Sequence, residues 1–385
     1  MNLGEPAFLS TLEAHAQAPI VGGNRLTLLL NGEQIYPAIL DAIRRARRTI
    51  TYAQYSYEDG KIARDLAEAL AERCRAGVTV HVLLDSVGTL SMPREYVELM
   101  SREGCQVVTF RPIGPFGLGS ANNRNHRRIL VVDGRIGFTG GSGVGSKWVG
   151  NGRVADHWRD TDVRIEGPVV EYLQGAFAEN WVEATGVVLG GADYFPPPDG
   201  PKGRTRAQII RSGPRAGSYS MYTTFLLALS SARHSIKITN PYVLLDEQMI
   251  ETLVQAARRG VRISFLVPGV IDHPLVRHAG RRQFGRLLEE GVEIHEYTAS
   301  LLHAKTMVID GILATVGSTN LDHRSFRLND ELNVVAYDPA FAAKLEQVFE
   351  DDLRYARRVD LEAWRDRGIR GRMMEFLAIP LESNL

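Results

Sequence analysis

From His303 to Asn320 the chain reads HAKTMVIDGILATVGSTN. Two short runs of apolar and β-branched residues, 306–309 and 314–316, flank an Asp-Gly pair at 310–311. Apolar runs of this length around an Asp-Gly pair are typical of two antiparallel strands joined by a tight turn. The stretch therefore predicts a β-hairpin with polar residues at its open end, and we expect the rest of the chain to be organised around it.

The polar residues at that open end suggest phosphate chemistry. Side chains two apart on a strand point to the same side, so His303 and Lys305 are expected to share one space. A fixed ammonium binds a phosphate oxyanion, while an imidazole attacks phosphorus or moves a proton. Ser318 and Asn320, again two apart, are candidates for neutral donors to the same oxyanion.

A second copy of this pattern occurs earlier in the chain. From His126 to Gly143 the sequence is HRRILVVDGRIGFTGGSG, with a histidine, a cation at Arg128 and an acid at Asp133 in the same spacing. The surrounding segments recur as well: an amphipathic helix running into a strand at 35–52 has its counterpart at 221–238. The chain thus carries an internal duplication of alternating helices and strands.

The boundary between the repeats is expected at a proline-rich linker. Gly190 and Gly191 are followed by the run PPPDGP from Pro196, and consecutive prolines suit a stiff connection. Residues 1–24 have the character of a loose lead-in. The predicted domains are 1–197 with the first histidine motif and 198–385 with the second motif and a basic amphipathic tail.

The two histidine motifs resemble the signature of the phospholipase D superfamily. Within it, Gly317 to Phe326 (GSTNLDHRSF) and Asn329 to Asn333 (NDELN) are similar to segments of bacterial cardiolipin synthases. The resemblance runs from Gly23 to the arginine-rich C-terminal segment. It implies an α/β fold of two tandem domains, each a mixed sheet flanked by helices, related by a pseudo-twofold axis.

The resemblance also implies a mechanism that uses no metal or other cofactor. One imidazole forms a covalent phosphohistidine while the other protonates the departing alcohol and then deprotonates the incoming one. The family's usual order assigns the nucleophile to His126 and the acid/base to His303; the residues alone do not decide between them. Glu331 matches the family's acid that orients a catalytic histidine, and Asp160 is its counterpart in the first repeat.

Other positions in the motifs are open to two interpretations. Asp133 and Asp310 are either site residues or simple turn formers. Arg128 stands where lysine is usual, yet its guanidinium still matches two phosphate oxygens. Gly141 and Gly143 stand where the second copy has its serine and asparagine, so two side-chain donors are lost in the first copy.

Composition and cysteine content argue against a general nucleic-acid-binding protein and against a zinc site. The 385 residues include 45 Lys and Arg and 45 Asp and Glu. This zero net charge makes nucleic acid an unlikely general partner. Cys74 and Cys105 lie in apolar contexts and are expected to be buried thiols, and the sequence has no zinc-site spacing.

The expected location is cytoplasmic, at the inner face of the cell membrane. The first residues lack the basic and apolar regions of a signal peptide, and no apolar run is long enough for a transmembrane helix. The segment from Arg354 to Leu381 mixes arginines with apolar residues. It is either an amphipathic stretch that lies on an anionic membrane surface or a helix packed on its own domain.

The resulting functional hypothesis is a cardiolipin synthase. It would transfer a phosphatidyl group from one phosphatidylglycerol to another and release glycerol. One alternative is a phosphodiesterase that hydrolyses phospholipid or nucleic acid. Another, suggested by the altered first motif, is a catalytically weak lipid-binding scaffold. The acceptor alcohol, the acyl preference and the oligomeric state do not follow from the sequence.

Overall fold

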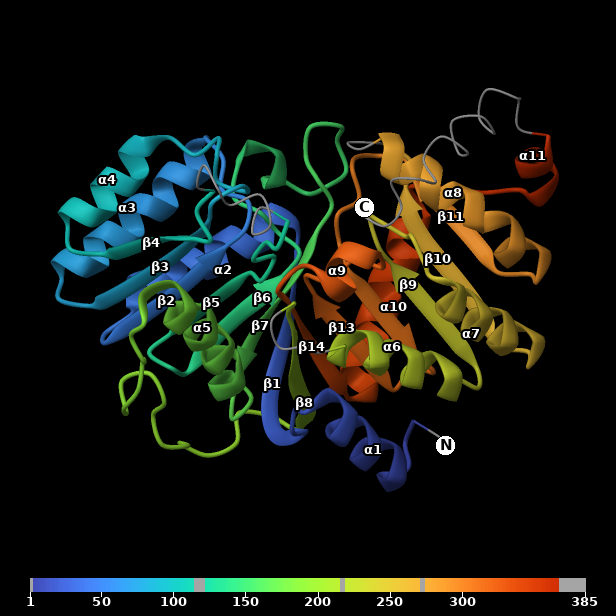
Figure 1. The fold of residues 1–385 in the computed structure, drawn as a ribbon, viewed down its shortest axis with the longest axis horizontal. Helices are drawn as coiled ribbons and strands as arrows, with labels where there is room; N and C mark the ends of the chain where they lie inside the picture. Colours follow the sequence, from blue (N-terminus) through green and yellow to red (C-terminus); the bar gives the residue numbers. More distant parts are fainter. Residues whose placement is uncertain (1–2, 114–121, 215–218, 271–273, 367–385) are drawn as a thin grey trace.

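The structure is a computed structural model that describes residues 3–113, 122–214, 219–270 and 274–366. In the first half of the chain, strands and helices alternate up to the fourth strand; a hairpin, a short 3₁₀ helix, one more strand and a closing helix follow (Figure 1). These elements are β1 (Val21–Leu30), α2 (Asn31–Arg45), β2 (Thr49–Gln54), α3 (Lys61–Arg75), β3 (Thr79–Asp85), α4 (Arg94–Arg102), β4 (Gln106–Phe110), β5 (Ile129–Val132), β6 (Ile136–Gly140), the short 3₁₀ helix η1 (Ser146–Trp148), β7 (Thr161–Glu166) and α5 (Val170–Thr185).

The second half repeats this order element by element, which confirms the predicted duplication. Its elements are β8 (Thr205–Ser212), α6 (Ser220–Ser231), β9 (Ser235–Thr239), α7 (Glu247–Arg258), β10 (Arg262–Pro268), α8 (Pro274–Glu289), β11 (Glu293–Tyr297), β12 (Thr306–Ile309), β13 (Leu313–Gly317), α9 (His323–Arg327), β14 (Glu331–Tyr337) and α10 (Pro339–Leu353). Two short elements follow, β15 (Ala356–Arg358) and α11 (Leu361–Arg365).

The described strands form one continuous mixed sheet in the order β15-β11-β10-β9-β12-β13-β14-β8-β1-β7-β6-β5-β2-β3-β4. Read outward from its centre, each half shows the same sequence of strands. β1 and β8 join the halves as antiparallel neighbours, with Val21 opposite Ala207 and Asn24 opposite Thr205. The α/β fold with pseudo-twofold halves is therefore confirmed, and the two sheets merge into one.

Helices cover both faces of this sheet (Figure 1). In β2, Ile50 and Tyr52 pack in the core with α2 and α3, whereas Ala53 points into the core on the opposite face. That opposite core combines Phe177 of α5 with Phe341 of α10, so one helix from each half contributes to it. The shared core makes the centre of the sheet the natural place for residues of both halves to meet.

The N-terminal segment corrects one prediction. Residues 1–24 were expected to be a loose lead-in, but in the described part of this segment α1 (Pro6–Ala16) forms and β1 already begins at Val21. Phe8, Leu12 and Ala16 recur every four residues and are buried against the second half, where α1 packs on α6. That spacing is the helical signal that the sequence analysis overlooked.

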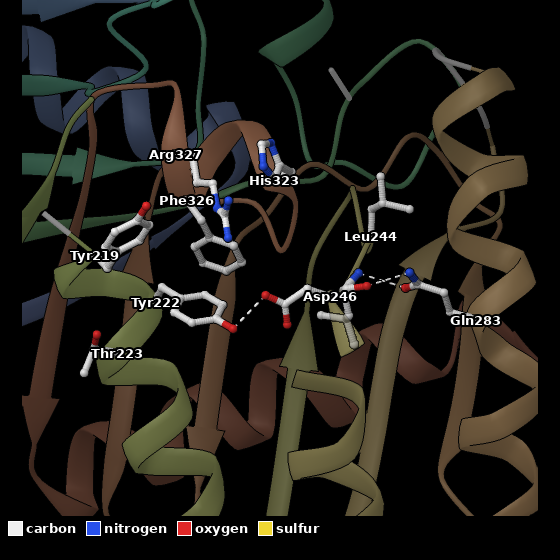
Figure 2. Close-up of a pocket in the computed structure, with 10 residues that line it drawn as sticks. Tyr219, Tyr222, Thr223, Leu244, Asp246, Gln283, His323, Phe326 and Arg327 are labelled. Carbon is white, nitrogen blue, oxygen red and sulfur yellow. Dashed lines mark hydrogen bonds between the residues drawn. The ribbon is translucent and has the colours of Figure 1, made fainter. Parts of the chain in front are cut away.

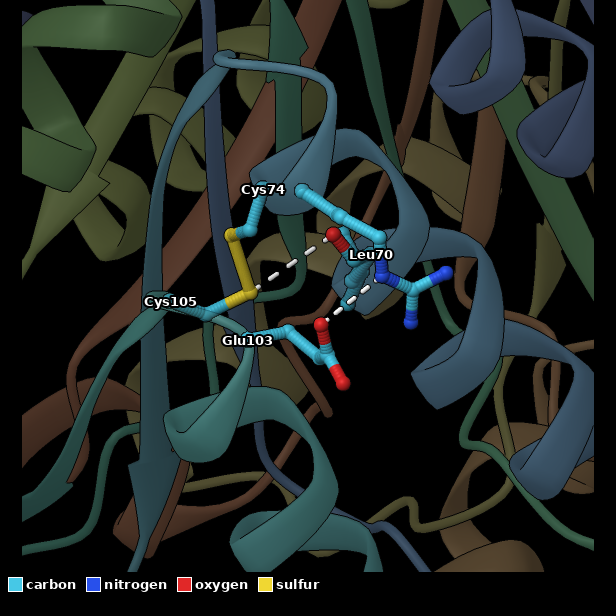
Figure 3. Close-up of a disulfide and its surroundings, with 5 residues drawn as sticks. Leu70, Cys74, Glu103 and Cys105 are labelled. Carbon is cyan, nitrogen blue, oxygen red and sulfur yellow. Dashed lines mark hydrogen bonds and ion pairs between the residues drawn. A yellow bond between two sulfur atoms is a disulfide. The ribbon is translucent and has the colours of Figure 1, made fainter.

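The cysteines correct a second prediction. Cys74 and Cys105 are not free thiols but form a disulfide, with Cα atoms 5.7 Å apart (Figure 3). Cys74 lies at the end of α3, and Cys105 lies in the turn that leads into β4. The packing of α3 on α4 brings the two positions into disulfide range, which the sequence separation alone does not reveal.

The structure describes the linker between the repeats and only the first part of the tail. The proline run lies between α5 and β8, and a domain division at residue 197 stays a prediction. β15 pairs with β11 at the sheet edge, and Arg357 and Arg365 form ion pairs with Glu296 and Glu289. The rest of the tail, residues 367–385, lies outside the described residues. Among the described helices, none is both long and apolar enough to cross a bilayer.

Arg127 links the two halves beneath the hairpin of the first motif. Its side chain is fully buried, with 1% of its surface exposed. It donates to Asn180 Oδ1 at 2.8 Å in the first half, and to the carbonyl oxygens of Ser212 and Glu331 at 3.1 and 3.2 Å in the second. A buried cation with this many acceptors fixes the position of each acceptor.

We expect Arg127→Ala to lower the free energy of unfolding by about 3–5 kcal/mol, because it leaves several buried acceptors without a donor. Urea unfolding followed by circular dichroism measures this. Arg211→Ala is the matched control, since Arg211 also pairs with Glu179 but its side chain is 44% exposed, and its loss should cost at most about 1 kcal/mol. Equal effects of the two substitutions would contradict the role given to Arg127.

Candidate active site

Both histidine motifs stand immediately before the first strand of a hairpin. β5 pairs with β6 and β12 pairs with β13, both antiparallel. The Asp-Gly pairs at 133–134 and 310–311 have positive φ at both residues, between 52° and 63°, as a tight primed turn requires. The hairpins predicted from the sequence are thus present, and each aims its histidine away from its turn.

Asp133 and Asp310 lie at the turn ends of these hairpins, a full strand away from the histidines. Asp133 accepts backbone N–H groups at the start of β2, including that of Arg48 at 2.7 Å. Asp310 does the same at the start of β9, including the N–H of His234 at 2.7 Å. Both carboxylates therefore anchor a hairpin to the neighbouring strand, the turn-forming interpretation, and neither joins the histidines.

The histidines form two pairs with carboxylates, and each pair crosses between the halves. Nδ1 of His126, in the first half, lies 2.9 and 3.0 Å from the two carboxylate oxygens of Glu331 in the second. Nδ1 of His303, in the second half, lies 2.7 Å from Oδ2 of Asp160 in the first. The backbone crosses at the same places, since the N–H of His303 donates to the carbonyl oxygen of Arg159 at 2.7 Å.

The two cations of the motifs are buried beside their own histidines. Arg128 donates to the carbonyl oxygen of His126 at 2.8 Å, and its other terminal nitrogen lies 3.1 Å from Nε2 of the same ring. Lys305 donates to the carbonyl oxygen of His303, and its Nζ lies 3.0 Å from Nδ1 of that ring. All four residues are at most 7% exposed, and the cation of each half acts electrostatically on the imidazole of the other half. They therefore form one water-poor cluster of imidazoles and cations.

This cluster changes the protonation of both imidazoles. Burial lowers the pKa of His126 well below its ordinary value, and the charges of Arg128 and Lys305 lower it further. Burial and the charge of Lys305 lower the pKa of His303 to about 3, and Arg128 of the opposite half contributes as well. Both rings are therefore neutral near pH 7. With the Nδ1 hydrogens donated to carboxylates, Nε2 is the unprotonated nitrogen of each ring. Nε2 of His126 accepts a hydrogen bond from Arg128 in this structure, so Arg128 must turn to the phosphate before that nitrogen can react.

The two carboxylates differ in their protonation. Burial raises the pKa of Glu331 to about 7, although hydrogen bonding from Ser318 opposes the shift. Burial acts on Asp160 in the same direction, but the interactions with His303 and Lys305 outweigh it and leave the pKa of Asp160 below its ordinary value. The site thus contains one firmly ionised acid and one that titrates near neutrality.

Ser318 and Asn320 occupy different surroundings, although both were predicted to bind phosphate. The Ser318 hydroxyl donates to Oε2 of Glu331 and accepts the N–H of Leu332 at 3.0 Å, so its hydrogen bonds hold the carboxylate. Asn320 is 6% exposed, and its Oδ1 has no hydrogen-bond partner among the described residues. Asn320 therefore remains the better candidate for a contact to substrate: its Oδ1 can accept from a substrate hydroxyl, and only its amide N–H groups can donate to a phosphate oxygen.

Steric constraints explain why the first motif has glycine at positions 141 and 143. A Cβ on Gly141 would lie 2.2 Å from Oδ1 of Asp160, and a Cβ on Gly143 would lie 2.5 Å from the ring of Trp148. The first half therefore replaces the serine and asparagine of the second motif with room for a carboxylate and an indole. The first motif lacks the two side-chain donors because Asp160 and Trp148 fill the space that they would need.

Aromatic side chains surround the histidines, and sequence reasoning did not assign them to the site. Trp158 and Trp148 lie beside His303, with ring centroids 5.3 and 6.0 Å away. Tyr55 meets His126 edge to face at 4.8 Å. No motif spacing connects these aromatics to the histidines, although Tyr55 directly follows β2 and so ends near the same edge of the sheet.

Known proteins resemble this chain in sequence and in fold. A family model described as "Cardiolipin synthase, PLD-like domain" matches residues 39–181 and 225–353. A cardiolipin synthase of Geobacillus kaustophilus is 35% identical over 361 residues, which are 93% of this chain and 72% of the relative. Cardiolipin synthase A of Pseudomonas fluorescens is also 35% identical, over 95% of this chain and 76% of the relative.

Among solved structures, a phosphatidylserine synthase of Haemophilus influenzae covers 98% of this chain and is itself covered completely, with a TM-score of 0.72. Its sequence identity is 11%, so this likeness concerns the fold alone.

The raised pKa of Glu331 predicts a pH-dependent stability. Its folded pKa of about 7 exceeds the ordinary 4.5, so the folded state holds more protons in that window and loses stability as the pH rises through it. Glu331→Gln removes this penalty. We expect its stability relative to the wild type to improve between pH 4.5 and pH 8, by on the order of 3 kcal/mol.

Urea unfolding of both proteins at several pH values measures this change. Comparing the same pair of proteins across pH cancels the hydrogen bonds that the substitution itself alters, as well as the titration of groups that both proteins retain. A stability difference that is independent of pH would contradict the raised pKa.

Proposed function

This chain belongs to the family of cardiolipin synthases with phospholipase D-like domains, and we propose that it joins two phosphatidylglycerol molecules through a phosphohistidine intermediate. The enzyme is thus a phosphatidyltransferase. The observation that supports the proposed mechanism is the crossed arrangement of the two histidine–carboxylate pairs. It supplies two imidazoles with fixed orientation, and a phosphodiester exchange needs one as nucleophile and one as acid and base.

In the first step, Nε2 of His126 attacks the phosphorus of the donor lipid. His303 takes up a proton from solvent when the anionic substrate binds. The bond from phosphorus to the glycerol oxygen breaks, and Nε2 of His303 gives that proton to the oxygen, so glycerol leaves. Glu331 stabilises the positive charge that develops on the attacking ring through its contact with Nδ1. The product of this step is a phosphatidyl group bonded to His126.

In the second step, the hydroxyl of another phosphatidylglycerol replaces the leaving glycerol. His303 takes the hydroxyl proton, the oxygen attacks phosphorus, and the bond to His126 breaks. The product is cardiolipin, and both histidines return to their starting states. The cycle conserves the number of phosphodiester bonds and therefore requires no external source of energy.

The substrate completes the electrostatics of the site. The neutral resting state of His303 depends on burial and on the charges of Lys305 and Arg128. A bound phosphodiester brings a negative charge to those cations, which raises the pKa of a neighbouring imidazole. Asp160 then stabilises the imidazolium that protonates the leaving oxygen. Binding of substrate thus prepares His303 to act as an acid.

A phospholipid substrate requires the enzyme to reach a membrane surface. We propose peripheral association with the anionic inner surface of the cell membrane, supported by the lipid substrate and by the arginines of the tail. In the described part of that tail, Arg357, Arg358 and Arg365 form ion pairs with the second half but keep more than half of their side-chain surface exposed.

Product analysis tests the proposed function. Purified protein is incubated with phosphatidylglycerol vesicles in the presence of a chelator, and the lipids are identified by mass spectrometry. We expect cardiolipin and glycerol in equal amounts. Phosphatidic acid as the main product would indicate a hydrolase instead, and vesicle binding without any turnover would indicate a scaffold.

The positive charge of Arg128, the cation of the first motif, leads to a further prediction. Arg128→Ala removes a positive charge where negative charge develops on the phosphoryl oxygens, and the rate of phosphatidyl transfer should fall on the order of 10²–10³-fold. Arg128→Lys keeps the cation and should retain most of the rate, although it loses the two-pronged contact. Initial rates of cardiolipin formation measure both. An alanine variant as active as the lysine variant would show that the charge of Arg128 does not act on the substrate.

A further inference from the structure

A cavity of about 540 Å³ lies in the second half, outside the histidine cluster (Figure 2). It is bounded by the start of α6, by the helix α9, by the loop between β9 and α7, and by α8. Its volume falls within the range of roughly 300–1,000 Å³ that is typical of pockets for small molecules. The mechanism proposed above makes no use of this space.

The walls of the cavity are connected to the reaction site. Asn320 N donates to Ser325 Oγ at 3.2 Å, which fixes the start of α9 against the candidate phosphate ligand. Leu244, on another wall, donates its N–H to Leu321 O at 2.7 Å. His323 lines the cavity and follows Asn320 by three residues, so their Cα atoms are at most about 11 Å apart.

Several polar groups of the walls are hydrogen-bonded within the walls themselves. The Tyr222 hydroxyl donates to Asp246 at 2.6 Å, and Gln283 exchanges two hydrogen bonds with the backbone of Leu245, at 2.6 and 2.8 Å (Figure 2). The cavity offers an occupant the faces of aromatic rings and the side chain of Leu244, together with Nδ1 of His323, which has no hydrogen-bond partner among the described residues. Such a lining favours an apolar ligand over a sugar or a free polyol.

The mouth of the cavity is basic and aromatic. Arg327 is exposed, and its guanidinium lies 5.8 Å from the centre of the Tyr219 ring, which is 51% exposed. An exposed tyrosine next to a basic side chain is typical of a surface that meets the polar headgroups of an anionic bilayer. The cavity thus combines an apolar interior with a rim that is complementary to phospholipid headgroups.

We propose that this cavity takes one acyl chain of a phosphatidylglycerol substrate while the phosphate of the same lipid is held near Asn320. The proposal rests on the proposed function, which supplies the lipid. The glycerol backbone and ester linkage would span the short distance over the start of α9. Arg327 at the rim would contact headgroup phosphates of the surrounding bilayer.

Photocrosslinking of the wild-type protein tests the proposal directly. Phosphatidylglycerol with a diazirine in one acyl chain is added in vesicles, and the labelled peptides are mapped by mass spectrometry after irradiation. We expect labels on Tyr222, Thr223 or Phe326. Labels confined to residues outside the cavity would overturn the proposal and would show that the acyl chain stays in the bilayer.

A variant that fills the cavity provides the functional test. Thr223→Trp should abolish the labels in the cavity and raise the KM for dioleoyl phosphatidylglycerol, by about fourfold for each methylene that it excludes. The KM for dibutanoyl phosphatidylglycerol should not change. Ser230→Trp is the matched control, because Ser230 is exposed on the same helix and does not line the cavity.

The two lipids also separate this proposal from the proposed function. If the wild-type enzyme makes cardiolipin from both lipids but Thr223→Trp leaves the labels and both KM values unchanged, the acyl site is wrong and the proposed function stands. If the wild-type enzyme makes no cardiolipin from either lipid, the proposed function fails and this inference fails with it.

Discussion

The crossed pairing of each histidine with a carboxylate from the opposite half is the interaction on which the site depends. His126 relies on Glu331, and His303 relies on Asp160, so neither half contains a complete histidine–acid pair. Because these groups are buried, each carboxylate needs its partner in place, and a small relative shift of the halves would leave charges uncompensated. The continuous sheet through β1 and β8, the core shared by α5 and α10, and the contacts of Arg127 all prevent that shift.

The two pairs are not equivalent, and this asymmetry suits two different roles. Glu331 receives a hydrogen bond from Ser318 and has a pKa of about 7, whereas Asp160 sits against Gly141 and stays ionised. Glycine at 141 leaves room for the carboxylate of Asp160, because a Cβ at that position would lie 2.2 Å from its Oδ1. The permanently ionised acid therefore accompanies the ring that must carry a positive charge before the first bond breaks, which is the role proposed for His303.

Local sequence patterns predicted which elements and residues form the site, but they did not predict the long-range contacts between them. The hairpins, the repeat and the two acids follow from spacing and from the family resemblance. By contrast, Ser318 contacts Glu331, which depends on how β13 and β14 pair. Trp148 contacts His303 from the short helix η1, which no periodic pattern in the sequence predicts. The merger of two sheets into one and the disulfide between Cys74 and Cys105 are likewise long-range outcomes. The helix α1 was different, because its four-residue apolar spacing was visible and was overlooked.

The central claim is that both histidines act on one phosphate, with a covalent intermediate on His126. Rapid acid-free quenching of the His303→Ala variant with labelled phosphatidylglycerol, followed by mass spectrometric mapping, tests it most directly. This variant lacks both the acid that protonates the leaving glycerol and the base that activates the incoming alcohol. The account therefore predicts a phosphatidyl adduct on His126 that forms slowly and then persists, while cardiolipin formation stops. An adduct on another residue, or continued cardiolipin formation by His126→Ala, would contradict the account.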